Sequence, residues 1–128
     1  MTEGPDTKRL YALRGAISVE RNEVEAILDG TRELMTQLME RNELAPERIV
    51  SCIFTATTDL NAQFPAVAAR DLGLDRVPLL CTQEIEVPGA LERVIRVLLH
   101  YYAADSHAPQ HVYLREAKSL RADIESAQ

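Results

Sequence analysis

The sequence predicts a single α/β domain, of the α+β kind, with a mixed β-sheet and its helices on one face. Strand-like apolar runs alternate with stretches of helical periodicity, and the run at 49–57 is apolar on both faces like an interior strand. A chain of 128 residues can bury one core. We therefore expect one domain over residues 1–128, with a loose N-terminus at 1–8 and a flexible C-terminal tail at 119–128.

The first half of the chain should contain two strands that flank a long helix. The first strand is expected at 10–19, where Gly15 would permit a bulge or a close approach of another backbone. A capping-box-like start at Asn22 opens a helix that should run to about Asn42, because apolar residues recur along it at helical spacing. The second strand is the apolar run at 49–57, predicted to lie inside the sheet.

The second half of the chain is predicted to continue the alternation. A short helix at about 65–72 begins with proline and ends at Gly73, as helices often do. The third strand should cover 77–87, and an amphipathic helix should follow over 89–103. A last short strand is expected at 111–117.

One face of this sheet would have no helix to cover it. Strands as apolar as IVSCIFTAT need cover on both faces, and the predicted helices suffice for one. Association with further copies of the chain, most simply as a closed ring, would bury the other face.

Charge and cysteine content exclude several classes of protein. The chain has 14 basic and 20 acidic residues, a net charge of −6, whereas nucleic-acid binding needs clustered positive charge. The longest apolar run contains Arg96 and is too short to span a membrane. Cys52 and Cys81 have no metal-ligand spacing, and we expect reduced thiols in a cytoplasmic protein, with a disulfide between them as the alternative.

The end of the third predicted strand and the helix after it carry the candidate chemistry. Cys81, Glu84 and Arg96 would be brought together at a strand–helix corner, where they could orient a small oxyanion. Each also has an ordinary interpretation. Arg96 lies four residues after Glu92 and could form a surface ion pair, Cys81 could be a small buried hydrophobe, and Glu84 a solvated carboxylate.

Four stretches of the chain resemble the trimeric α/β type of chorismate mutase. They are LRGAISVERN at 13–22, TATTDLNAQFPAVAARDL at 55–72, CTQEIEVPGALERVIRVL at 81–98 and HVYLREAKSLR at 111–121. The resemblance implies rearrangement of chorismate to prephenate, in the branch toward phenylalanine and tyrosine, without metal or cofactor. It also implies a homotrimer with a pseudo-α/β-barrel and active sites between subunits.

The same resemblance assigns roles to individual residues. Arg14 matches an arginine that binds a substrate carboxylate, and Arg96 matches the arginine that approaches the ether oxygen of the breaking bond. Glu84 and Cys81 match the pair that contacts the ring hydroxyl, and Tyr113 resembles a tyrosine that donates to a carboxylate.

Further binding residues are implied for the wall, floor and lid of the site. The neighbouring subunit is expected to contribute a wall with Phe64, Ala66 and Arg70. Leu79 and Leu80 are expected to line the floor. The tail that closes over the ligand is expected to contain Leu120 and Arg121. Two positions depart from the family pattern. Val67 occupies a place where a lysine can occur, and Leu80 replaces a smaller polar residue, so both could alter affinity.

These residue types suit a pericyclic rearrangement, which needs no nucleophile, general base or metal. An enzyme can hold the flexible dianion in its reactive shape and stabilise charge where the C–O bond breaks. Arg96 would stabilise the ether oxygen, while Arg14, Arg70 and Arg121 would hold carboxylates through forked donors. Two alternatives stay open: a non-catalytic trimer that binds a small carboxylate, and a trimer of the imine-deaminase type.

Overall fold

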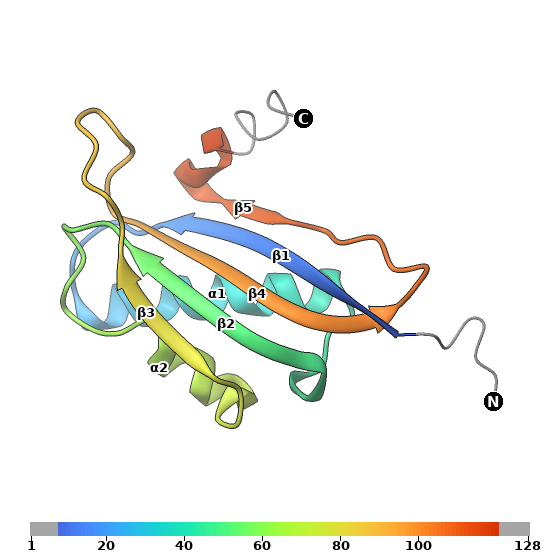
Figure 1. Ribbon diagram of the computed structural model, residues 1–128. Coiled ribbons are helices and arrows are strands. Elements are labelled where there is room, and N and C mark those ends of the chain that lie inside the picture. Colours follow the sequence, from blue (N-terminus) through green and yellow to red (C-terminus); the bar gives the residue numbers. More distant parts are fainter. Residues whose placement is uncertain (1–7, 121–128) are drawn as a thin grey trace.

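The computed structural model describes residues 8–120, which form a mixed five-stranded sheet with helices against one face (Figure 1). The elements in chain order are β1 (Lys8–Ser18), α1 (Val24–Arg41), β2 (Ile49–Ala56), α2 (Ala66–Ala69), β3 (Leu79–Gln83), β4 (Val94–Ala104) and β5 (Val112–Leu114). Three further helical turns lie at Pro46–Arg48, Arg70–Leu74 and Arg115–Ala117. The predicted class, a mixed sheet with helices on one face, is confirmed.

The central strand of the sheet is β4. It pairs antiparallel with β1 on one side and with β2 on the other. The edge strands are β3, parallel to β2, and β5, parallel to β1. The prediction that the run at 49–57 is an interior strand is confirmed, since β2 has a partner on each side.

The predicted helix over 89–103 is wrong, because β4 occupies most of that range. The buried side chains of β4 alternate along the strand: Ile95, Val97 and Leu99 are at most 3% exposed, and the residues between them are partly exposed. This is the period of two that a strand imposes. Apolar side chains occur on both faces, so hydrophobic spacing also fitted a helix, and pairing with strands on both sides decides the conformation.

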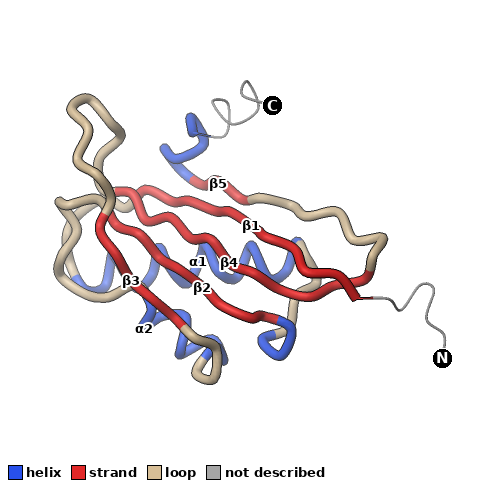
Figure 2. The backbone as a smooth tube through the Cα atoms, viewed as in Figure 1, coloured by secondary structure: helices blue, strands red, loops and turns tan. Residues whose placement is uncertain are grey.

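Two other predicted strands are shorter than expected. The range 77–87 contains the five residues of β3 and then a protruding loop that leads to β4 (Figure 2). The range 111–117 contains β5 and then a 3₁₀ turn at Arg115–Ala117. Residues 8–120 therefore contain one long helix where two were predicted, and the strand–helix corner of the prediction is a strand-to-loop corner.

The long helix α1 lies close to its predicted bounds, but its predicted cap is wrong. Glu23 occupies the N-cap position and makes no side-chain cap bond. The side-chain oxygen of Asn22 instead accepts hydrogen bonds from the backbone N–H groups of Asn61 and Ala62, at 2.9 and 3.0 Å. Asn22 therefore ties the connection between β2 and α2 to the start of α1.

The core lies between the helices and one face of the sheet. Most of its largest fully buried side chains come from α1 and from three strands, and these include Leu13, Ile17, Ile27, Leu34, Leu38, Phe54, Leu99 and Tyr101. The close backbone approach expected at Gly15 is present: a Cβ there would lie 3.1 Å from the Val112 carbonyl oxygen, and also 2.9 Å from Leu38 Cδ1 of α1. The absence of a side chain at Gly15 therefore lets the helix sit directly on β1.

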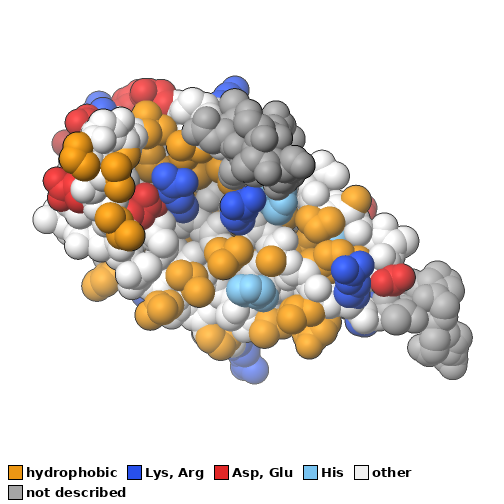
Figure 3. Space-filling view, turned by 45° about the horizontal axis from the view of Figure 1, so that its top comes forward, with side chains coloured by type: hydrophobic (Ala, Val, Ile, Leu, Met, Phe, Trp, Pro, Cys, Tyr) orange, Lys and Arg blue, Asp and Glu red, His pale blue; other side chains and the backbone are white. Residues whose placement is uncertain are grey.

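The opposite face of the sheet, which we call the uncovered face, has no long helix over it in the described part of the chain, although the helical turn at Arg115–Ala117 packs on Ala16 and Val94 beside β5. Leu10, Leu80 and Tyr102 stand on it with 50%, 60% and 45% of their surface exposed. Figure 3 shows hydrophobic side chains gathered around a histidine, with Lys and Arg side chains beside them. Within residues 8–120, no helix is both long enough and apolar enough to cross a membrane.

Candidate active site

Glu84 and Arg96 meet on the uncovered face, as predicted. The Nε–H of Arg96 donates to Glu84 Oε2 at 2.8 Å, and the Thr55 hydroxyl donates to the same oxygen at 2.6 Å. The side chain of Glu84 is 16% exposed and that of Arg96 is 42% exposed. A carboxylate with two donors on one oxygen and little contact with water is held in a defined orientation.

Strand pairing explains why these side chains converge. Thr55 of β2 stands directly opposite Arg96 of β4 in the antiparallel ladder, so both side chains point to the same face. Glu84 is the residue after β3, and its backbone N–H donates to the Ala56 carbonyl at 3.0 Å. The carboxylate is therefore delivered from the sheet edge toward the central strand.

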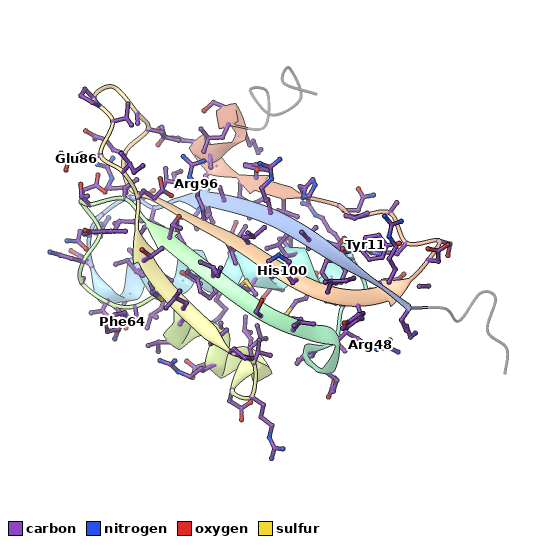
Figure 4. All side chains as sticks on the ribbon, in the orientation of Figure 1. Tyr11, Arg48, Phe64, Glu86, Arg96 and His100 are labelled. Atoms are coloured by element: carbon purple, nitrogen blue, oxygen red, sulfur yellow. The ribbon has the colours of Figure 1, made fainter. Side chains whose placement is uncertain are left out.

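Arg96 lines a cavity of about 420 Å³ on the uncovered face, which we call the arginine cavity. The cavity also contains Arg14, Thr55, Tyr113 and Leu120. Figure 4 shows the labelled Arg96 side chain at the end of the sheet near the protruding loop. Arg14, Arg96, Tyr113 and Leu120, which the sequence assigned to one site, are thus brought together.

Arg14 and Tyr113 reach the arginine cavity from the two strands beyond β4. Arg14 pairs with Leu98 and so stands on the strand next to Arg96, on the same face. Tyr113 of β5 lies opposite Ala16, which in turn lies opposite Arg96. Tyr113 is 8% exposed and packs with Ala16 and Leu120 in a small cluster of its own. The fold therefore presents two guanidinium groups and one phenol to a single hollow.

The charge balance of the arginine cavity favours anions. It holds two arginines, Arg14 and Arg96, and the neighbouring Glu84 carboxylate neutralises part of the charge of Arg96 alone. A local excess of positive charge in a chain of net charge −6 favours the binding of small anions in this cavity.

Cys81 does not join Glu84 and Arg96, so the prediction that one chain brings the three together is wrong. Cys81 lies opposite Phe54 in the parallel ladder and packs against the main core cluster. Side chains of a strand alternate between faces, and the position of Cys81 in β3 sends its thiol to the helix side. The closeness of Cys81 and Glu84 in the sequence does not show which face of the sheet each side chain occupies.

Cys81 lines a second cavity, of about 360 Å³, which we call the thiol cavity. Phe64 borders it and is 65% exposed, although it is a large apolar residue. The cavity lies between the ends of β2 and β3 and the connection that leads into α2. Phe64 of the predicted wall therefore lines a cavity with Cys81 and not the arginine cavity, although Thr55 borders both cavities.

The other expected binding residues are dispersed. Ala66 is 5% exposed inside α2, and Arg70, at the end of α2, is exposed. Leu79 packs partly against the core, whereas Leu80 projects from the uncovered face. Arg121 lies outside the described residues. Within one chain these side chains do not form a closed site around the arginine cavity.

Thr55 is the site residue that sequence reasoning missed. It lies in the stretch TATTDLNAQFPAVAARDL, but no role was attached to it. The sequence feature that could have identified Thr55 is the alternation of side chains between the two faces of β2, which places Thr55 on the face opposite Phe54. Once β4 is known to be a strand, the same alternation places Thr55 on the face that carries Arg96.

The two cysteines are free. Burial raises the pKa of the Cys52 thiol to about 12, and the neighbouring Cys81 adds to the rise. Cys52 therefore behaves as a small core residue at neutral pH. Within residues 8–120, no group of three or more His, Cys, Asp or Glu side chains is placed to hold a metal ion.

Comparison with known proteins gives a consistent result. A family model described as chorismate mutase type I matches residues 10–124. Chorismate mutase AroH of Thermus thermophilus is 50% identical over 121 residues, covering 91% of this chain and 97% of the relative. Chorismate mutase AroH of Bacillus subtilis (strain 168) is 41% identical over 120 residues, covering 90% and 92%. A solved chorismate mutase from Clostridium thermocellum superposes with a TM-score of 0.81 at 43% identity, covering 85% of this chain and 98% of that one.

Proposed function

The chain belongs to the chorismate mutase type I family, and from this premise we propose which residues carry its reaction. The enzyme is an isomerase that rearranges chorismate to prephenate, a step of aromatic amino acid biosynthesis. This assignment is favoured over a non-catalytic carboxylate-binding trimer and over an imine-deaminase-like trimer.

Arg96 is the principal catalytic residue in this proposal. The observation that carries it is the bond from Arg96 Nε to Glu84 in a cavity that also holds Arg14. Because Nε is engaged by Glu84, the two terminal nitrogens of the guanidinium are left for the substrate. They would donate to the ether oxygen as its C–O bond breaks, so the interaction would be strongest in the transition state.

Glu84, Arg14 and Tyr113 would fix the substrate in its reactive shape. Glu84 Oε2 already accepts from Thr55 and Arg96, so Oε1 is the oxygen that would accept the ring hydroxyl. Arg14 and the Tyr113 hydroxyl would donate to carboxylate groups from the strands on the other side of the cavity. Holding a flexible dianion in this way lowers the entropy cost of a unimolecular rearrangement, and no cofactor is required.

We propose further that the complete site forms between subunits of a homotrimer. Two observations support this: the uncovered face carries exposed apolar side chains, and Cys81 with Phe64 lies apart from Glu84 with Arg96. A head-to-tail ring would bring the thiol cavity of one subunit to the arginine cavity of the next. Arg70 and Leu80 would then contribute from the neighbouring chain. Two free cysteines support a cytoplasmic location.

The experiment that tests the proposal compares two arginine substitutions in chorismate turnover, followed by the loss of chorismate absorbance. Arg96→Ala should lower kcat by about 100- to 1000-fold, the usual effect of removing one donor to developing charge. Arg48→Ala is the matched control, since Arg48 is exposed and lies at the opposite end of the sheet (Figure 4). Equal turnover by the two variants would remove Arg96 from its proposed role.

A further inference from the structure

We propose that Thr55 is a positioning residue of the reaction: its hydroxyl orients the Glu84 carboxylate toward the ring hydroxyl of the substrate. The inference rests on the proposed role of Glu84. It is carried by the 2.6 Å bond from Thr55 Oγ1 to Glu84 Oε2, the shortest of the contacts that hold this carboxylate.

Glu84 needs such a support because of where it lies in the chain. It follows the last residue of the edge strand β3 and begins the protruding loop, in which Ile85 is 87% exposed. One backbone bond, from Glu84 N to the Ala56 carbonyl, anchors the residue to the sheet. The side chain beyond that anchor must be oriented by contacts of its own.

Arg96 alone is a poor support for the carboxylate. Its side chain is long and 42% exposed, and in the proposed mechanism it must also respond to charge that develops on the substrate. Thr55 stands in the interior strand β2, and its branched Cβ restricts χ1. The Thr55 hydroxyl is therefore held in one position, whereas the guanidinium of Arg96 can move.

The bond also restricts rotation of the Glu84 carboxylate. Thr55 and Arg96 both donate to Oε2, so that oxygen is occupied from β2 and from β4. Neither of these two donors bonds to the remaining oxygen, Oε1. Without Thr55 the carboxylate could rotate about its last bond away from this orientation, and neither oxygen would be held where it can accept the ring hydroxyl.

Substitutions of Thr55 test the inference. Thr55→Val keeps the shape and branching of the side chain but removes the donor, and should lower kcat by about 10- to 100-fold with a smaller change in KM. Thr55→Ser keeps the donor and should retain most of the activity. Thr58→Val is the matched control, because it removes a comparable threonine–glutamate bond, to Glu86 at 3.0 Å, outside the arginine cavity.

A substrate analogue without the ring hydroxyl separates positioning from general structural damage. Glu84 cannot accept a hydrogen bond from this analogue, because the analogue has no ring hydroxyl. Thr55→Val and the wild type should therefore rearrange the analogue at similar rates. An equal penalty with chorismate and with the analogue would overturn the inference.

Glu84→Gln distinguishes failure of the inference from failure of the proposed site. If Thr55→Val turns over chorismate like the wild type while Glu84→Gln is impaired, the positioning role is overturned and the proposed function stands. If Glu84→Gln also has wild-type turnover, the proposed role of Glu84 fails and the positioning role fails with it.

Discussion

Cys81 and Glu84 are three residues apart in the sequence, and their side chains lie on different faces of the sheet. Cys81 faces the core, like its ladder partner Phe54, whereas the side chain of Glu84 hydrogen-bonds to Thr55 and Arg96 on the uncovered face. A substrate held by both the thiol and the carboxylate would therefore have to lie between two chains. The proposed subunit-shared site leads to a direct test.

Two inactive variants should restore activity when they assemble together. Arg96→Ala damages the arginine cavity, and Phe64→Asp places a negative charge beside the thiol cavity, where it would repel the dianionic substrate. In a head-to-tail ring of randomly mixed chains, about a quarter of the sites would combine two intact halves. Refolding the variants together should thus give about a quarter of wild-type turnover.

The control for this experiment is each variant refolded alone. Activity in the mixture equal to the sum of the two separate variants would show that both residues serve a site within one chain. That outcome would contradict the shared site.

The uncovered face should be the surface through which the chains associate. Tyr102 on this face is 45% exposed, and Val24 at the start of α1 is 41% exposed. Tyr102→Glu should therefore shift the protein toward smaller species in sedimentation, because a charge buried in an interface is costly. Val24→Glu introduces the same charge at a similarly exposed apolar position and should leave the assembly unchanged. Identical sedimentation of both variants would place the interface elsewhere.

Most of the fold could be predicted from the sequence where one kind of periodicity dominates. The helix α1 has a clear apolar stripe, and β2 is a short apolar run bounded by polar turns. The strand β4 could not be predicted, because VIRVLLHYYAA is apolar on both faces and fits either period. Its conformation is decided by β1 and β2, which pair with it from distant parts of the chain.

The site was partly predictable for a related reason. Resemblance to a family identified Glu84 and Arg96, and their contact is present in the structure. The position of Cys81 depends on the phase of a five-residue strand, and a shift of one residue would reverse its face. The contribution of Thr55 depends on its register with β4, which required β4 to be recognised as a strand.

Stability should fall in alkaline solution because of buried acidic groups in the core. Burial raises the pKa of Cys52 from its ordinary value of 9.0 to about 12, and burial raises that of Tyr101 from 10.0 to about 12. Between these limits the unfolded chain releases protons that the folded chain retains. The contribution of these two groups to the free energy of unfolding is therefore constant below about pH 9 and decreases as the pH rises toward 12.

Urea unfolding at a series of pH values measures this decrease. Cys52→Ala should lower stability at neutral pH, because it removes a buried group, and should also make the alkaline decrease shallower. A slope identical to that of the wild type would show that Cys52 has no part in the effect.

Gly30 of α1 should resist substitution even though alanine is the better helix former. Replacing an interior glycine by alanine normally stabilises a helix by about 1 kcal/mol. A Cβ at Gly30, however, would lie 2.5 Å from Val19 Cγ1, and Val19 is 4% exposed. Overpacking of this kind costs about 1–3 kcal/mol, so Gly30→Ala should lower the free energy of unfolding.

The sign of this effect should reverse when the opposing side chain is shortened. In a Val19→Ala background the space that the new Cβ needs is open, and the intrinsic helix preference of alanine should then dominate. Gly30→Ala should therefore be neutral or stabilising in that background, measured by urea unfolding against Val19→Ala alone. If Gly30→Ala is equally destabilising in both backgrounds, contact with Val19 is not what requires glycine at this position.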